Sequence, residues 1–169
     1  ADGNIYCLRT KNGKLIWKLQ TGAAVLGAPL IHDNTVYIGG SNGIRAVDLT
    51  TGKERWAFTG TQGPVVSAPL LYDGKIIVGA WDTYLYALDK NNGGLVWKWN
   101  NGSTIRNFSP ASCTPLAADG MVYVVAPDRY ITAIDAVTGT TSWRSNQSAI
   151  RESIGLSENG QLVYGKTMN

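Results

Sequence analysis

The sequence predicts an all-β fold, a β-propeller built from four-stranded antiparallel blades. An eleven-residue pattern ending in Trp occurs four times, and successive tryptophans are 39, 41 and 46 residues apart. A period of about 40 residues is typical of propeller blades. No ten-residue segment shows the 3.6-residue periodicity of an amphipathic helix, so a helical solenoid with a similar period is disfavoured.

The repeated pattern begins with a small residue, an apolar residue and Asp, and a Gly follows four residues after the Asp. Its copies are CLRTKNGKLIW (7–17), AVDLTTGKERW (46–56), ALDKNNGGLVW (87–97) and AIDAVTGTTSW (133–143). Only the first copy departs at the Asp position, where it has Arg9. The repeat residues are Trp17, Trp56, Trp97 and Trp143, Gly13, Gly52, Gly93 and Gly139, and Asp48, Asp89 and Asp135.

These repeat residues are predicted to have structural roles. A single four-stranded blade cannot bury both of its faces, so it has to stack on its neighbours. One Trp per blade can fill the space to the next blade, and the small residue ten positions earlier leaves room for close packing. The Asp is expected to accept hydrogen bonds from N–H groups of the turn that follows it, and the first hairpin must be held differently.

A second repeated block supplies the other two strands of each blade. It reads APLIHDNTVYIGG from Ala28, APLLYDGKIIVGA from Ala68 and TPLAADGMVYVVA from Thr114, with a degenerate copy from Ile154. Each copy begins with a short apolar strand. A turn of Asp-Asn, Asp-Gly or Asn-Gly comes next, and a strand of β-branched or aromatic residues follows it. This order predicts a β-hairpin.

The whole chain is predicted to be one propeller segment of about four blade equivalents. The predicted blades are 1–22 (half), 23–60, 61–101, 102–147 and 148–169 (half). The chain is either part of a larger ring of seven or eight blades, which we favour, or its half blades pair within one copy or between two copies. Half blades expose unpaired sheet edges, and these predict a possible homodimer.

Composition excludes several classes of function. The net charge is only +3 and the Lys and Arg residues are scattered, so no nucleic-acid partner is expected. No apolar run reaches the ~18 residues that a transmembrane segment needs. The two cysteines, Cys7 and Cys113, fit no metal-binding or redox spacing, and buried thiols are the expectation, with a disulfide as the alternative.

The A-x-D-x-x-T-G-x-x-x-W pattern resembles the repeat of the pyrroloquinoline-quinone (PQQ) type β-propellers over essentially the whole chain. That resemblance implies one of three kinds of protein. Quinoprotein dehydrogenases bind PQQ and calcium, the outer-membrane assembly lipoprotein is a propeller without cofactor, and other propellers are attached to a kinase or hydrolase. The resemblance also favours a periplasmic or extracytoplasmic location. Fold alone does not decide among these functions.

No residue is predicted to be catalytic, and neither a metal nor a cofactor is expected. Adjacent cysteines, which the resemblance implies for quinoprotein alcohol dehydrogenases, are missing, and so is any carboxylate-dense segment that could hold a hard cation. Nucleophile-elbow, zinc-protease and P-loop motifs are also missing. His32, the only histidine, lies next to a hairpin turn. The chain is therefore interpreted as a non-enzymatic module, closer to the propellers without cofactor.

Variable loops gather on one face of the predicted propeller, opposite the repeated hairpins. They include an unusually long link between blades, residues 100–110. An aromatic residue and an Arg on one surface are common binding anchors. The candidate face comprises Trp81, Arg106, Asn107, Phe108, Asp128 and Arg129, and it is predicted to bind a protein partner. The alternative is that Trp81 and Phe108 fill the central channel or cover the end of a blade.

Overall fold

The computed structural model describes residues 2–147 and 150–167, and it is built almost entirely from β-strands. Three four-stranded antiparallel sheets occupy the middle of the chain. The first contains β3 (Leu30–His32), β4 (Thr35–Gly40), β5 (Gly43–Asp48) and β6 (Glu54–Phe58). The second contains β7 (Leu70–Tyr72), β8 (Lys75–Gly79), β9 (Tyr84–Asp89) and β10 (Leu95–Asn100). The third contains β11 (Leu116–Ala118), β12 (Met121–Val125), β13 (Ile131–Asp135) and β14 (Thr141–Ser145).

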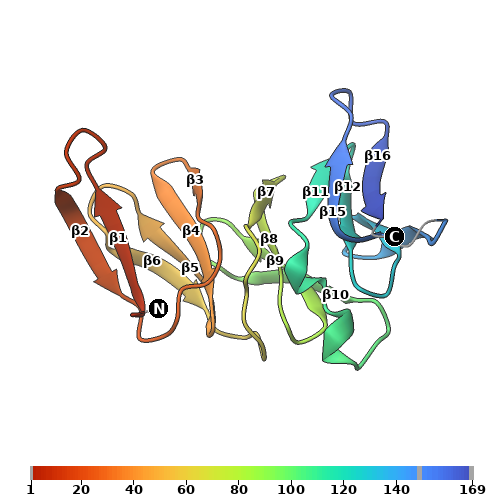
Figure 1. Ribbon diagram of the computed structural model, residues 1–169, viewed down its shortest axis with the longest axis horizontal. Helices are drawn as coiled ribbons and strands as arrows, with labels where there is room; N and C mark the ends of the chain where they lie inside the picture. The colour runs from red at the N-terminus through yellow and green to blue at the C-terminus, as the bar shows by residue number, and fades with distance from the viewer. Residues whose placement is uncertain (1, 148–149, 168–169) are drawn as a thin grey trace.

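A two-stranded sheet lies at each end of this series. The first joins β1 (Asn4–Leu8) to β2 (Leu15–Gln20), and the last joins β15 (Ile150–Leu156) to β16 (Val163–Thr167). The five sheets follow one another along an arc, with the β1–β2 hairpin at one end and the β15–β16 hairpin at the other (Figure 1). The prediction of an all-β propeller of four-stranded blades is confirmed.

The blades are joined by a Trp–Gly contact that recurs at three junctions. The rings of Trp17, Trp56 and Trp97 cover a glycine in the last hairpin turn of the next blade. A Cβ atom added to that glycine would lie 2.5–2.7 Å from the ring, too close for any real side chain. The three glycines are Gly52, Gly93 and Gly139, with φ of +71°, +72° and +72°.

Each of these tryptophans is also fixed by a hydrogen bond across the junction. Trp17 donates its Nε1–H to the Leu49 carbonyl at 2.8 Å. Trp56 and Trp97 donate to the carbonyls of Lys90 and Ala136, both at 3.0 Å. In all three cases the acceptor lies three residues before the covered glycine. Directly opposite each Trp on the neighbouring strand is the small residue of the repeat, for example Ala87 opposite Trp97.

The repeat Asp closes its hairpin turn. Oδ1 of Asp48 accepts the N–H groups of Thr50 and Thr51 at 3.0 and 2.8 Å. Asp89 and Asp135 make the corresponding pairs of bonds. The first hairpin has Arg9 at this position and keeps only the bond that all four turns share, in which the Asn12 Oδ1 accepts the N–H of Lys14 at 3.2 Å.

Apolar side chains fill the spaces between consecutive sheets. Between the second and third sheets, Ile77 of β8 and Val122 of β12 are fully buried in one cluster with Trp97. Tyr37 and Ile76 belong to the corresponding cluster one junction earlier. Stacked sheets thus share their cores, and each core depends on the blade beside it.

Candidate functional site

The loops between the second and third strands of a blade share a fixed geometry. In three of them an Asp accepts, at 3.1 Å, the N–H of the residue two positions later: Asp2 from Asn4, Asp82 from Tyr84, and Asp128 from Tyr130. The residue between the Asp and the N–H donor has a positive φ, which is a strained backbone conformation for anything other than glycine. These residues are Gly3, Thr83 and Arg129, with φ of +69°, +80° and +72°.

The long link between the second and third sheets packs against one of these loops. The link contains two short 3-10 turns, η1 (Arg106–Phe108) and η2 (Pro110–Ser112). Fully buried Ser109 accepts the Thr83 N–H on its Oγ at 2.9 Å. The Asn100 amide donates to Thr83 Oγ1 at 2.7 Å and to the Ser103 carbonyl at 3.0 Å. The link is therefore held in place by buried polar contacts.

Trp81 and Arg106 each contact the preceding link, residues 60–64. The N–H of Trp81 donates to the Pro64 carbonyl at 3.0 Å, and Gly63 lies against the Trp81 backbone with no room for a Cβ. The Arg106 guanidinium reaches the Gln62 carbonyl at 3.5 Å. Trp81 is half-buried and Arg106 is exposed, and both residues contact the same short link.

Phe108 and Asp128 form a second group, and it is tied into the protein. The Asn101 amide bridges them by donating to the Phe108 carbonyl at 3.2 Å and to Asp128 Oδ2 at 2.7 Å. Arg144 also binds that carboxylate oxygen, at 2.6 Å. Because both oxygens of Asp128 are engaged internally, its role in the structure is to connect the link to the third sheet.

The remaining candidates, Asn107 and Arg129, are exposed to solvent. Among the described residues, neither Arg106 nor Arg129 makes an ion pair with a carboxylate. The nearby Asp82 is buried, and its carboxylate accepts the Tyr86 hydroxyl at 2.7 Å and the Gln62 N–H at 2.8 Å. Burial beside that carboxylate raises the pKa of the Tyr86 hydroxyl well above its usual range. The accessible charge of this loop cluster is thus positive.

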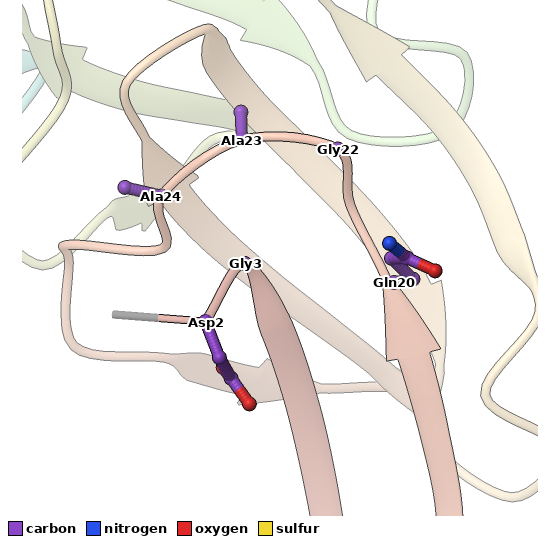
Figure 2. A pocket seen from close by; sticks show the side chains of 6 residues that line it. All are labelled: Asp2, Gly3, Gln20, Gly22, Ala23 and Ala24. Atoms are coloured by element: carbon purple, nitrogen blue, oxygen red, sulfur yellow. The ribbon is translucent and has the colours of Figure 1, made fainter.

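A hollow of about 290 Å³ lies on the same side of the propeller, beside the start of β1 (Figure 2). Its walls are Asp2 and Gly3 on one side and Gln20, Gly22, Ala23 and Ala24 on the other. The Asp2 carboxylate accepts the Tyr6 hydroxyl and the Asn4 N–H, and these bonds lower its pKa to about 2. The hollow therefore offers a small, mostly glycine and alanine surface in which the one carboxylate is already bonded.

Residues with catalytic or metal-binding chemistry are dispersed over the molecule. In the described part of the chain, no three His, Cys, Asp or Glu side chains gather at one centre. His32 is exposed and contacts Asp33 at 2.8 Å. Within that same part, Cys7 and Cys113 are separate thiols, and burial raises the pKa of Cys113 to about 11. None of the helices in the described residues is long and apolar enough to cross a membrane.

Sequence reasoning missed the residues that hold the candidate face in place. They are Asn100, Asn101, Ser109 and Arg144. The contacts of Asn101 and Ser109 join two different blades, and those of Asn100 and Arg144 join distant residues of one blade. No local pattern marks such contacts. The sequence does contain one signal for these loops, an Asp that they share at Asp2, Asp82 and Asp128. In each case this Asp lies seven residues before the Asp position of the main repeat.

Known proteins resemble this chain in both sequence and structure. Beta-alanine-activating enzyme of Danio rerio is 33% identical over 98 residues, which are 52% of this chain and 8% of that protein. Quinohemoprotein alcohol dehydrogenase of Comamonas testosteroni is 33% identical over 109 residues, 57% of this chain and 15% of that protein. The crystal structure of BamB from Moraxella catarrhalis matches with a TM-score of 0.70 and 25% identity, covering 86% of this chain and 45% of that one.

The chain spans less than half of each of these relatives. A family model described as outer membrane protein assembly factor BamB matches residues 1–98 and, in a second register, residues 41–168. The two matches begin 40 residues apart, about one repeat, as expected when each blade resembles the next. On this evidence the chain belongs to the BamB family of PQQ-like β-propeller repeats.

Proposed function

We propose that this chain is a non-enzymatic protein-interaction module that binds its partner through the loop cluster around Trp81 and Arg106. The observation that carries the proposal is a pair of exposed arginines, Arg106 and Arg129, on loops that buried hydrogen bonds hold in place. Loops held by a rigid scaffold are where propellers and other repeat folds place their binding residues. Membership of a family named for an outer-membrane assembly factor supports the same function.

The chemistry of the cluster indicates which kind of partner it fits. Arg106 and Arg129 supply positive charge, and the side chain of Ile105 beside them is 55% exposed. Trp81 adds part of an aromatic surface. A partner segment with acidic residues next to apolar ones would complement both features, because interfaces pair opposite potentials and bury apolar anchors at their centre.

The experiment compares partners captured by the wild-type chain and by matched variants from an extract of the cells that make it. Arg106→Glu and Trp81→Ala are expected to weaken binding of the captured partner about 30-fold each, the effect of losing an anchor worth ~2 kcal/mol. Lys53→Glu makes the same charge change at an exposed position in a hairpin on the opposite face and should leave binding unchanged. Equal capture by all four proteins would contradict the proposal.

The quinohemoprotein relative supports a second proposal, that the chain is part of a PQQ-dependent dehydrogenase. A third possibility is a sensor or scaffold domain attached to a kinase or hydrolase. Saturable binding of PQQ with calcium would favour the dehydrogenase.

A further inference from the structure

A polar hollow of about 140 Å³ lies between the first and second sheets, on the face that carries the hairpin turns. One wall comes from the turn between β3 and β4 together with β4 and β6, and the other comes from the turn after β9. The residues that line it are Asp33, Thr35, Tyr37, Arg55, Lys90 and Asn91. Every one of these side chains carries a polar atom, so the hollow suits a polar ligand.

The contact between the two blades holds Lys90 in place beside the hollow. Its backbone carbonyl accepts the Nε1–H of Trp56 at 3.0 Å and the hydroxyl of Tyr37 at 3.3 Å. The rings of Trp56 and Tyr37 pack on each other with their centroids 5.9 Å apart. Two donors from the preceding blade therefore fix the backbone from which the Lys90 ammonium extends.

The guanidinium of Arg55 is held on the opposite wall through one of its nitrogens. Nη2 of Arg55 donates to Asp48 Oδ2 at 2.7 Å and to the Asn34 carbonyl at 3.2 Å. Among the described residues, Nε and Nη1 have no acceptor. A guanidinium oriented in this way offers its remaining N–H groups to a carboxylate or phosphate group.

The hollow contains more unused donors than acceptors. Lys90 Nζ contacts only Asp33 Oδ2, at 3.4 Å, which is long for a hydrogen bond between charged groups. That same oxygen lies 2.8 Å from His32 Nε2, and the Asp33 side chain is 70% exposed. The side-chain amide of Asn91 has no hydrogen-bond partner in the part of the chain that the structure describes. A ligand that accepts hydrogen bonds and carries negative charge complements this set of donors.

The next junction between blades shows that packing does not require these donors. It has the same Trp–carbonyl bond and an apolar core of the same kind. The only charged residues at its equivalent positions are Asp73 and Lys75, which pair with each other at 2.7 Å. The three positions that supply the donors of the hollow are occupied there by Val96, Ala136 and Val137.

We propose that this hollow binds a small anion that carries a carboxylate or phosphate group. The anion lies between Arg55 and Lys90, and the Asn91 amide supplies a third donor. Bound there, it replaces the long contact between Lys90 and Asp33 with shorter, charge-assisted hydrogen bonds. The hollow is on the face opposite the loop cluster, so this inference does not depend on the proposed function.

The test is a titration of the 169-residue chain with sodium phosphate and, separately, with sodium acetate, followed by ¹⁵N–¹H NMR. Ionic strength is kept constant so that screening of surface charges does not change. The amide signals of Lys90 and Asn91 are expected to shift and to reach saturation with at least one of the two anions. The anion with the lower Kd identifies which group the hollow binds.

Two variants convert the hollow to the residues of the next junction. Arg55→Val and Lys90→Ala should both fold, because that junction packs with Val96 and Ala136 in the same positions. Each is expected to raise the Kd about 10-fold through the loss of a hydrogen bond between charged groups. Lys98→Ala is the matched control, because it removes one exposed positive charge of the second sheet outside the hollow and should leave the Kd unchanged.

Shifts that stay linear and unsaturated with both anions would overturn the proposal and leave Asp33 as the sole partner of Lys90. The same Kd in Arg55→Val, Lys90→Ala and Lys98→Ala would also overturn it. Circular dichroism shows whether each variant is folded. Arg106→Glu should keep the wild-type Kd for the anion whether or not it loses its protein partner, so the outcomes for the two proposals are separate.

Discussion

The repeat glycines show how much a single residue does in this fold. Gly93 needs positive φ for its turn, and it also has to leave space for the ring of Trp56, which would lie 2.5 Å from an added Cβ. The first requirement can be inferred from an Asn-Gly or Thr-Gly turn in the sequence. The second cannot, because the ring comes from the preceding blade, 37 residues earlier in the chain.

The repeat aspartates give the stability of the chain a predictable dependence on pH. Hydrogen bonds from Arg55 and from Thr51 hold the pKa of Asp48 well below its usual value, and Asp135 shifts in the same direction. A carboxyl whose pKa is lower in the folded state stabilises it above the unfolded pKa, near 3.9, and this contribution is lost as the pH falls. We expect the free energy of unfolding to decrease from about pH 5 downward, and to decrease less in Asp48→Asn.

Urea unfolding at pH 6 and pH 3 measures this difference directly. The wild-type chain should lose more stability between the two pH values than the Asp48→Asn variant does. Equal losses in the two proteins would show that the bonds of Asp48 do not stabilise its charged form.

At the scale of elements, the long link between the second and third sheets is the least regular and most functionally informative part of the chain. The first of its two 3-10 turns carries Arg106 at the surface, and Ser109, which lies between the two turns, is buried in the interior. Gly79 of β8 lies so close to the link that an added Cβ would be 2.3 Å from the Pro110 carbonyl. The link is thus packed against the sheet while one side of it faces solvent.

Removing the buried hydroxyl of this link should destabilise the protein. Ser109→Ala leaves the Thr83 N–H without its acceptor in a fully buried place, at an expected cost of ~1–3 kcal/mol in the free energy of unfolding. Ser103→Ala removes a hydroxyl that accepts the Ile105 N–H at an exposed site, and it should cost less than ~0.5 kcal/mol. Chemical denaturation of both variants makes the comparison, and equal costs would mean that the link is not anchored at Ser109.

The regular elements could be predicted from the sequence, and the link could not. Alternating apolar residues and Asp-Gly or Thr-Gly turns report on local backbone geometry, so the hairpins follow from neighbouring residues. The position of the link depends on Asn100 and Asn101, whose amides contact Thr83 and Asp128 in other loops. Asp128 was therefore predicted as a surface residue of the binding face, whereas its carboxylate is bonded to Asn101 and Arg144.

At the scale of the whole molecule, three successive junctions between blades use the same Trp–Gly contact. Counting the repeats predicted three complete blades and a pair of strands at each end, and the sheets have this arrangement. The count could not show which side chains remain exposed at the two ends. Trp143 is 40% exposed, for example, whereas the equivalent Trp56 and Trp97 are 8% and 7% exposed.

We propose that this propeller binds proteins and does not hold a redox cofactor. The melting temperature of the chain with and without PQQ plus calcium tests that claim most directly, with a quinoprotein dehydrogenase as the positive control. A ligand present at 100 times its Kd stabilises the folded state by ~2.7 kcal/mol, which raises Tm by about 5–10 °C in a protein of this size. We predict no change in Tm at any ligand concentration, and a saturable rise of this magnitude would contradict the account.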